Sequence, residues 1–284
     1  MCIKTILVLI SEQTRHVALI FRSKKICKTI LKPDLVKIQY DCTFETTPRE
    51  FVQTMNIMAT YRGAKIPVWT CILTSKKVFL YTAILKKFSQ EYPCIKPKLI
   101  QSDFEAALHL AAKLVYPSAS VRGCWLHYSS ACYKQFKKRG LVKFYQSDRK
   151  VRRICRTIMA LPILPASKIC DQIDYIYNTA VKTLPDPTAQ KLLIDFNEEY
   201  LIKFWIKQIG PARMSVYGCP DKTNNATEQL HSLMHTNMPK HPVIFNFAYW
   251  LKRTIYNPYQ VKLAQLDDGK KIGFPHPESE KIQE

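Results

Sequence analysis

Residues 35–44 read Leu35-Val36-Lys37-Ile38-Gln39-Tyr40-Asp41-Cys42-Thr43-Phe44. Apolar and polar residues alternate along this stretch, a pattern typical of a half-buried β-strand. The strand carries Asp41 toward its end, shortly before the turn residues Thr46, Thr47 and Pro48. A carboxylate in an otherwise apolar strand is costly to desolvate unless a cation compensates its charge. The stretch therefore predicts a strand that holds an acidic side chain for a cationic partner.

Two later segments repeat this arrangement. A short apolar run at residues 98–102 ends at Asp103, and Glu228 stands at the opening of another helical segment. Hard divalent cations such as Mg²⁺ prefer carboxylate oxygens, and two such ions about 4 Å apart stabilise the attacking and leaving oxygens of phosphoryl transfer. We therefore predict that Asp41, Asp103 and Glu228 are catalytic and bind two Mg²⁺ or Mn²⁺ ions. Taken singly, each acid also fits a purely structural role.

The composition favours a polyanionic partner. The chain has 284 residues, a hydrophobic fraction of 47% and a formal net charge of +21. An excess of positive charge on this scale favours nucleic acid over an anionic membrane surface, because no strongly amphipathic basic helix stands apart from the core. No apolar run approaches the roughly 20 residues that a membrane span needs. The 10 cysteines form no CxxC pair, which favours reduced thiols in the cytosol or nucleus.

The periodicity of apolar residues predicts a mixed sheet flanked by helices, which is an α/β fold. A strand pair at residues 6–10 and 16–22 leads into a basic connector at 24–32. Five strands follow, at residues 35–44, 51–61, 65–74, 98–102 and 119–124. Helical patterns cover residues 78–92, 103–116 and 125–139, and later 151–160, 169–183, 188–206, 221–235 and 244–256. Because no strand pattern appears between residues 140 and 218, we expect an all-helical insertion there.

These elements predict five segments. The first is the N-terminal strand pair and basic connector, residues 1–34, which suits extension of the sheet. The first part of the core follows at 35–139, and the helical insertion at 140–218. The last part of the core, at 219–263, carries the third acid. A charged tail at 264–284, with Gly and Pro, is expected to be mobile.

Four motifs occur in the order found in the Mutator-like element (MULE) transposase domain, and together they resemble that family. Asp41-Cys42-Thr43-Phe44 is similar to its DGTF start, and Asp103-Phe104-Glu105-Ala106-Ala107 to its second acidic motif. Arg122-Gly123-Cys124-Trp125-Leu126-His127 resembles its RGCxxH motif. The fourth motif, TNNxxExxH, is matched by Thr223-Asn224-Asn225-Ala226-Thr227-Glu228-Gln229-Leu230-His231.

The resemblance implies a ribonuclease-H-like fold in which a five-stranded mixed sheet is flanked by helices and an all-helical insertion precedes the last catalytic helix. It implies DDE-type chemistry, with the three acids at Asp41, Asp103 and Glu228. The chain departs from the family at Cys42, where the usual residue is Gly. Nothing before Leu35 has zinc-ligand spacing of the kind that DNA-binding modules use. We therefore expect a separate sequence-specific DNA-binding module, or a longer precursor, to recognise the target DNA sequence.

Cysteine and histidine residues near two of these motifs have the spacing of metal ligands. Cys124 and His127 are separated by one helical turn, and His231 and His235 stand at i, i+4. Together these four residues can complete a tetrahedral Zn²⁺ site. Alternatively, they support the active site by hydrogen bonding, or Cys124 simply packs in the core.

Two basic clusters lie close together between the second and third acids. They resemble a bipartite nuclear-import signal and equally suit a phosphate-binding face. The nucleic-acid-binding candidates are Lys134, Lys137, Lys138, Arg139, Arg149, Lys150, Arg152, Arg153 and Arg156.

The sequence thus predicts a DDE-type transposase catalytic domain that cleaves and transfers DNA strands in the nucleus. DNA is the expected partner, self-association into a homo-oligomer is a further option, and no membrane is involved. The alternative is a captured, non-catalytic DNA-binding or transcription-regulatory protein that has kept the fold. Loss of an acid would favour this alternative, and all three acids are present.

Overall fold

The computed structural model describes residues 2–11, 14–35, 37–219, 222 and 225–270. The chain divides into two units. The first unit comprises residues 1–38, 42–96 and 226–284, and the second comprises residues 39–41 and 97–225. Strand β3 (Lys37–Thr43) contributes to both.

The strands form one mixed sheet of seven in the order β1-β2-β5-β4-β3-β6-β7. Strands β1 (Cys2–Ser11), β2 (Thr14–Arg22), β5 (Ala64–Leu73) and β4 (Gln53–Tyr61) pair antiparallel in that order, whereas β6 (Leu99–Gln101) and β7 (Ser120–Arg122) pair parallel. The five strands expected after residue 34 all form, and the N-terminal pair extends the sheet to seven. The predicted mixed α/β architecture, consistent with a ribonuclease-H-like fold, is confirmed.

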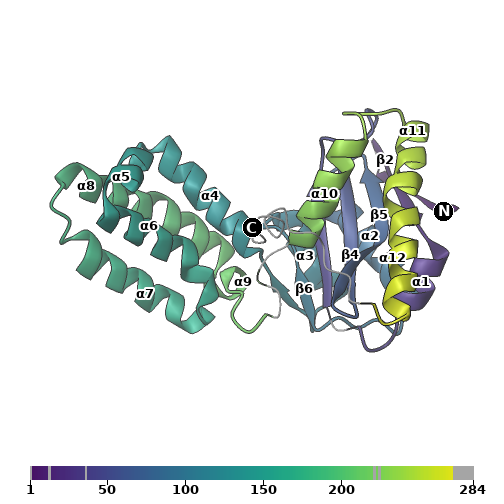
Figure 1. The fold of residues 1–284 in the computed structure, drawn as a ribbon, viewed down its shortest axis with the longest axis horizontal. Coiled ribbons are helices and arrows are strands. Elements are labelled where there is room, and N and C mark those ends of the chain that lie inside the picture. The colour runs from purple at the N-terminus through teal and green to yellow at the C-terminus, as the bar shows by residue number, and fades with distance from the viewer. Residues whose placement is uncertain (1, 12–13, 36, 220–221, 223–224, 271–284) are drawn as a thin grey trace, which may run out of the picture. The chain divides into compact units, whose positions relative to one another are not determined.

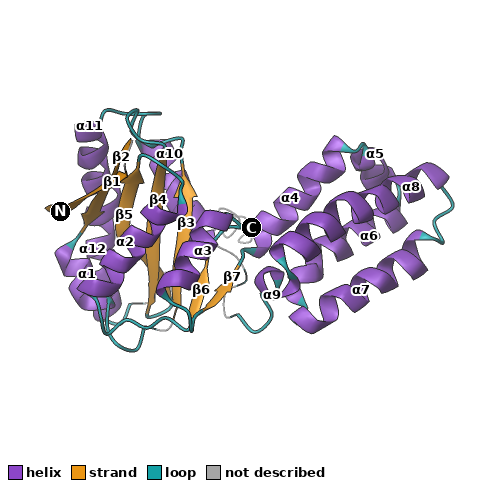
Figure 2. Ribbon diagram, turned by 180° about the vertical axis from the view of Figure 1, so that it is seen from behind, coloured by secondary structure: helices purple, strands orange, loops and turns teal. Residues whose placement is uncertain are grey.

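The alternation of side chains along β2 and β5 decides which helices cover each face of the sheet in the first unit. On one face, the Phe21 ring contacts Phe247 of α11 (Ile244–Trp250), and the Tyr256 hydroxyl donates to the Phe21 carbonyl. On the other face, Trp69 contacts Phe88 of α2 (Val78–Glu91) edge to face. Figures 1 and 2 show α11 and α12 (Asn257–Asp267) on one side of these strands and α2 on the other.

Two expectations for the first unit are wrong. The basic connector is a helix, α1 (Lys24–Ile30), because Ile26, Cys27 and Ile30 make one buried face and the Ser23 side chain caps the N-terminus. The tail expected from residue 264 begins as ordered structure, because α12 runs to Asp267 and buries Leu266. Residues 271–284 of that tail lie outside the described residues.

The second unit contains a helical block. It consists of α4 (Trp125–Lys138), α5 (Leu141–Ser147), α6 (Arg149–Ala160), α7 (Ile169–Tyr175), α8 (Pro187–Phe196) and α9 (Pro211–Met214). Helices α7 and α8 continue without a break as the π-helical segments η3 (Ile176–Val181) and η4 (Asn197–Ile209). Asp148 and Asp186 cap the N-termini of α6 and α8. Tyr128, Phe136, Phe196 and Trp205 lie fully buried in its core, so α4 packs with the later helices.

The sequence patterns located α4, α6, α7 and α8 well, whereas α5 and the four-residue α9 were not predicted. Helix α5 lies in the short interval between two expected helices and buries only Leu141 completely. In the part of the chain that the structure describes, every helix is too short or too polar to cross a lipid bilayer.

Candidate active site

Asp41 lies on β3 and is 2% exposed. The neighbouring strand in the sheet is β6, and Asp103 follows its last residue by two positions. The two strands are joined by buried amides: Gln39 Nε2 donates to Gln101 Oε1 over 2.9 Å, and Gln101 Nε2 donates to the Gly123 carbonyl over 3.5 Å. Because residues two apart on a strand share a face, Asp41 lies on the face of β3 that carries Gln39.

A tight turn positions Asp103 between β6 and α3 (Ala106–Val115). Its Oδ1 atom accepts from the Glu105 N–H at 3.0 Å, and its carbonyl accepts from the Ser102 hydroxyl at 2.9 Å. A side chain that binds the backbone two residues ahead favours a turn over a helix. For this reason α3 begins at Ala106 and not at Asp103, where the sequence pattern placed its start.

His109 of α3 hydrogen-bonds to the same turn, and Arg213 of α9 hydrogen-bonds to His109. His109 Nε2 lies 2.5 Å from the Asp103 carbonyl oxygen, and Arg213 Nε donates to His109 Nδ1 at 3.1 Å. A carbonyl only accepts, so the His109 proton is on Nε2 and the ring is neutral. Burial and the nearby Arg213 charge lower the pKa of His109 to about 4, which keeps it neutral at physiological pH.

Phe104 and Gly123 interlock beside this turn. A Cβ atom added to Gly123 would lie 2.1 Å from the Phe104 ring, and the same ring packs edge to face on Trp205. The Gly123 N–H donates to the Arg213 carbonyl at 2.8 Å. Gly123 is therefore required by close packing, and three distant segments of the second unit meet around the Asp103 turn.

The third acid, Glu228, belongs to the first unit and lies in the first turn of α10 (Asn225–Asn237), partly buried. His231 and His235 lie on the same helix and contact the sheet of their own unit. His231 Nε2 lies 3.2 Å from Asn56 Nδ2. His235 Nδ1 lies 3.2 Å from Glu45 Oε2, and its Nε2 lies 3.4 Å from Thr43 Oγ1. Both histidines thus have polar contacts with residues of the first unit.

Cys124 and His127 lie in the second unit, at the start of α4. The Cys124 sulfur is buried, and a ligand atom of His127 lies within 4.8 Å of it. His127 Nδ1 is buried and has no hydrogen-bond partner among the described residues. A thiolate and an imidazole at this spacing suit Zn²⁺. The four predicted zinc ligands are thus divided between the two units, with His231 and His235 already hydrogen-bonded.

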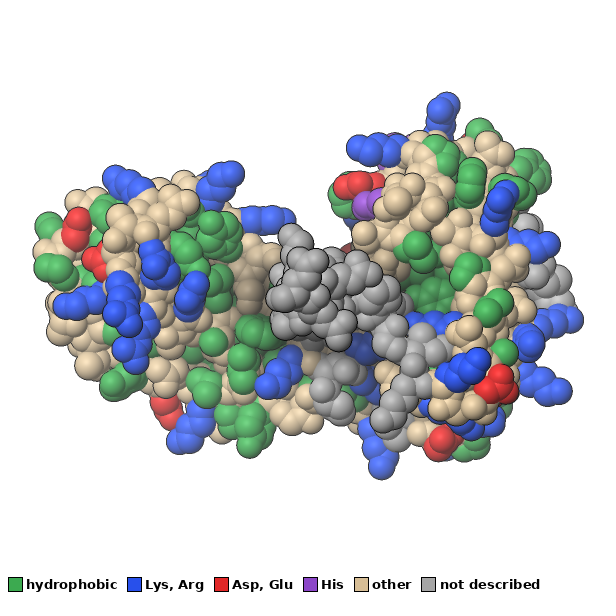
Figure 3. Space-filling view, in the orientation of Figure 1, with side chains coloured by type: hydrophobic (Ala, Val, Ile, Leu, Met, Phe, Trp, Pro, Cys, Tyr) green, Lys and Arg blue, Asp and Glu red, His purple; other side chains and the backbone are tan. Residues whose placement is uncertain are grey.

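All the predicted nucleic-acid-binding residues lie in the second unit, on α4, at its end and on α6. Figure 3 shows lysine and arginine side chains gathered over the helical block. On α6, residues 149, 152, 153 and 156 follow helical spacing along one side, opposite the buried Val151, Ile154, Cys155 and Ile158. At the end of α4, Arg139 pairs with Glu199 at 2.7 Å, so it is less available to a ligand.

Sequence reasoning missed Gln39, Gln101, His109 and Arg213. A signal for the first two was present, because each of the two aspartates follows a glutamine by two residues. His109 and Arg213 gave no signal, since their contact joins positions 104 residues apart.

Part of the chain matches a known protein family. Residues 37–131 match the MULE transposase domain. The matched region includes Asp41, Asp103, Cys124 and His127, whereas Glu228 lies beyond it. No curated protein matches the chain.

Proposed function

Because residues 37–131 match the MULE transposase domain, we propose that this protein is a DDE-type transposase catalytic domain. It cleaves DNA phosphodiesters and transfers the strand to water or to a DNA 3′-hydroxyl, in the nucleus. The observation that carries the proposal is the burial of Asp41, 2% exposed, on a strand next to the one that leads to Asp103. Carboxylate oxygens are the ligands that hard divalent cations prefer, so two acids on neighbouring strands suit such ions.

In this proposal Asp41 and Asp103 supply oxygen ligands for Mg²⁺ or Mn²⁺, and Glu228 remains the third acid predicted from the sequence. These carboxylates fit such ions because hard divalent cations prefer oxygen donors. When bound, the ions polarise the phosphodiester and lower the pKa of the attacking hydroxyl. The neutral His109 and the Asp103–Glu105 turn keep the Asp103 backbone in place without adding a competing charge.

The test is metal-dependent nicking of supercoiled DNA by the purified chain. We expect nicking with Mg²⁺ or Mn²⁺ and none with a chelator. Asp41→Asn and Asp103→Asn should each abolish nicking. Asp171→Asn is the control and should not affect it, because Asp171 is an exposed acid that pairs with Lys168 on the surface. Nicking that survives in both active-site variants would contradict the proposal.

The alternative is a non-catalytic DNA-binding or transcription-regulatory protein, and the basic side of α6 favours it independently of the acids. This alternative predicts DNA binding without cleavage, unchanged by the Asp41 and Asp103 substitutions. The nicking assay and a binding assay on the same variants therefore separate the two functions.

Zinc binding is a separate part of the proposal. Cys124 and His127 supply two suitable ligands, and the purified chain should then carry about one equivalent of Zn²⁺. Removing the ion with a chelator should lower the melting temperature. If metal analysis finds no zinc, Cys124 and His127 have only a role in packing and hydrogen bonding.

A further inference from the structure

The helical block contains a cleft between α6 and the α7–η3 helix that the proposed phosphodiester chemistry does not use. Its volume is about 430 Å³, within the range of small-ligand sites. Ile154, Ile176 and Ala180 contribute its apolar lining. The polar and aromatic lining consists of Lys150, Arg153, Thr157, Gln172, Tyr175 and Thr183.

Tyr175 is the unusual member of this lining. It is 62% exposed, while Ile169, Ile173 and Ile176 on the same helix are buried in the core of the block. The ring of Tyr175 is thus not needed to pack the helix, and it lines the cleft together with Lys150 and Arg153. Aromatic rings next to lysine and arginine are the usual means of binding unpaired nucleotides, because every base can stack on them.

The basic residues extend beyond the cleft. Arg153 also lines a second, adjoining hollow together with Arg149, Arg152 and Arg156. In that hollow Arg152 Nε donates to the Tyr145 carbonyl at 2.8 Å, and Arg156 Nε lies 3.3 Å from the Tyr145 hydroxyl. Two of these guanidinium groups are therefore held in place by α5. The arrangement offers a row of positive charge that a phosphate backbone can follow into the cleft.

We propose that this cleft binds an unpaired nucleotide of a DNA strand. Lys150 and Arg153 contact its phosphate, the base stacks on Tyr175, and Gln172 and Thr157 offer hydrogen bonds to the base edge. A base within a duplex is already stacked on its neighbours and cannot enter, so the subsite selects a frayed, flipped or single-stranded position. The inference rests on the proposed function, since it takes DNA as the substrate.

The experiment compares the affinity of the full chain for a single-stranded oligothymidylate and for a blunt duplex of equal length, at one salt concentration. Loss of one base–aromatic stack costs about 1–3 kcal/mol, so Tyr175→Ala should weaken single-strand binding by roughly 5- to 150-fold. It should leave duplex binding within about twofold. Tyr175→Phe keeps the ring and should bind like the wild type.

Two controls complete the design. Tyr249→Ala removes an exposed tyrosine from the first unit and should change neither affinity. Lys150→Gln should weaken single-strand binding and reduce its dependence on salt. Melting curves of all variants establish that they fold.

The outcomes separate this inference from the proposed function. Equal effects of Tyr175→Ala and Tyr175→Phe, or equal losses on both DNA forms, would overturn the nucleotide subsite. Wild-type binding to the duplex with none to the single strand would also overturn it, while leaving the proposed function intact. Failure of the wild-type chain to bind any DNA would overturn both.

Discussion

At the level of single residues, the Asp103 turn depends on contacts that come from outside its own motif. His109 reaches it from the following helix, and Arg213 reaches His109 from the far end of the helical block. Burial also lowers the pKa of Arg213, so its charge is retained only because Arg is a very strong base. The helical block therefore contributes to the geometry around the second acid as well as presenting a basic surface.

Replacing Gly123 by alanine should destabilise the second unit. The new methyl group would lie 2.1 Å from the Phe104 ring, and overpacking of this kind costs about 1–3 kcal/mol. Phe104→Leu should relieve the clash, so the double variant should lose less stability than the sum of the two single variants. Urea denaturation of the four proteins measures the coupling. Strictly additive losses would show that the two side chains do not compete for the same space.

Replacing Arg213 by methionine should weaken the proposed metal site without removing a ligand. His109 would lose the donor to Nδ1 and the Asp103 turn would lose its support. Loss of such a supporting contact typically costs 10- to 100-fold, so the Mg²⁺ concentration for half-maximal nicking should rise by about that factor. Arg213→Lys restores a donor and should recover part of the loss. An unchanged Mg²⁺ dependence in both variants would confine Arg213 to a structural role.

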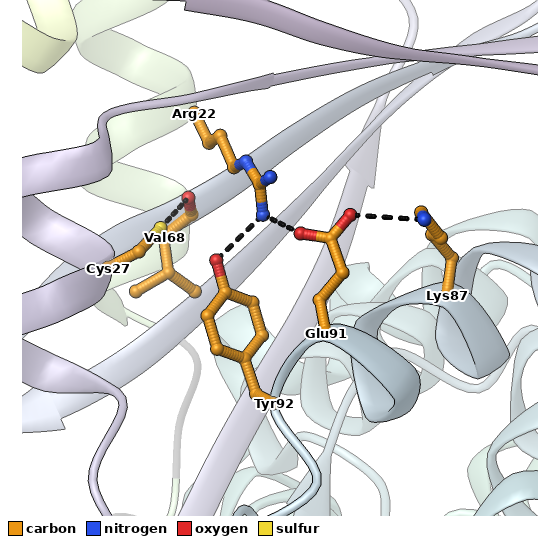
Figure 4. A network of polar contacts seen from close by, with 6 residues as sticks. All are labelled: Arg22, Cys27, Val68, Lys87, Glu91 and Tyr92. Carbon is orange, nitrogen blue, oxygen red and sulfur yellow. Dashed lines mark hydrogen bonds and ion pairs between the residues drawn. The ribbon is translucent and has the colours of Figure 1, made fainter.

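At the level of elements, the end of α2 is tied to β2 by a polar network (Figure 4). Arg22 of β2 pairs with Glu91 and donates to the Tyr92 hydroxyl at 2.8 Å, and Lys87 lies 3.4 Å from Glu91. The side chains of Arg22 and Glu91 are only 14% and 19% exposed. A pair this well shielded from solvent is costly to break from one side, because the remaining charge stays desolvated.

Arg22→Met should therefore lower the stability of the first unit by about 1–3 kcal/mol. The matched control is Lys168→Met, which removes a cation from the pair with Asp171, whose side chains are 67% and 69% exposed. Exposed pairs contribute about 0–1 kcal/mol, so this variant should be nearly neutral. Thermal melting compares the two. Similar small shifts in both would mean that the Arg22 network adds little to the docking of α2.

For the whole molecule, the net charge of +21 should dominate the association with DNA. With roughly six phosphate contacts, the affinity should fall about 1000-fold between 50 and 200 mM salt, because bound counterions are released on association. Fluorescence anisotropy at a series of salt concentrations gives the slope. An affinity that does not change over this range would argue against a phosphate-tracking surface.

We also expect the chain to bind DNA with little preference for sequence. Specific binding requires side chains delivered to base edges by a dedicated element, whereas the described residues before Leu35 form β1, β2 and α1 of the first unit. Selection from random DNA is the test. Enrichment of one clear motif would reveal a recognition element, for which the helical block is the first place to search.

The cysteines should report the integrity of the whole fold. Burial raises the pKa of both Cys132 and Cys155 to about 12, so they stay protonated and inert at pH 8. Cys94 and Cys170 are exposed and should react with iodoacetamide in the native protein. Mass spectrometry locates the labels. Fast native labelling of Cys132 would contradict the packing of the helical block.

Sequence alone was enough for the order and type of most elements, because each depends on local periodicity. The alternation at residues 35–44 predicted β3, and the apolar run before Asp103 predicted β6. Where local patterns failed, the element was short or a side chain competed with the backbone. Residues Lys24–Ile30 form a seven-residue helix whose lysines suggested a basic connector. Asp103 makes a turn where the start of a helix was expected.

The contacts that surround the acids could be found only after folding, because they join residues far apart in the chain. No local sequence pattern predicts that the Phe104 ring packs against Gly123, or that Arg213 hydrogen-bonds to His109. His231 and His235 have the i, i+4 spacing of metal ligands. Their polar contacts in the folded protein are with Asn56, Thr43 and Glu45, which no local pattern could predict. The spacing of residues along a helix predicts which of them share a face. Which groups those residues contact depends on how that face packs in the folded protein.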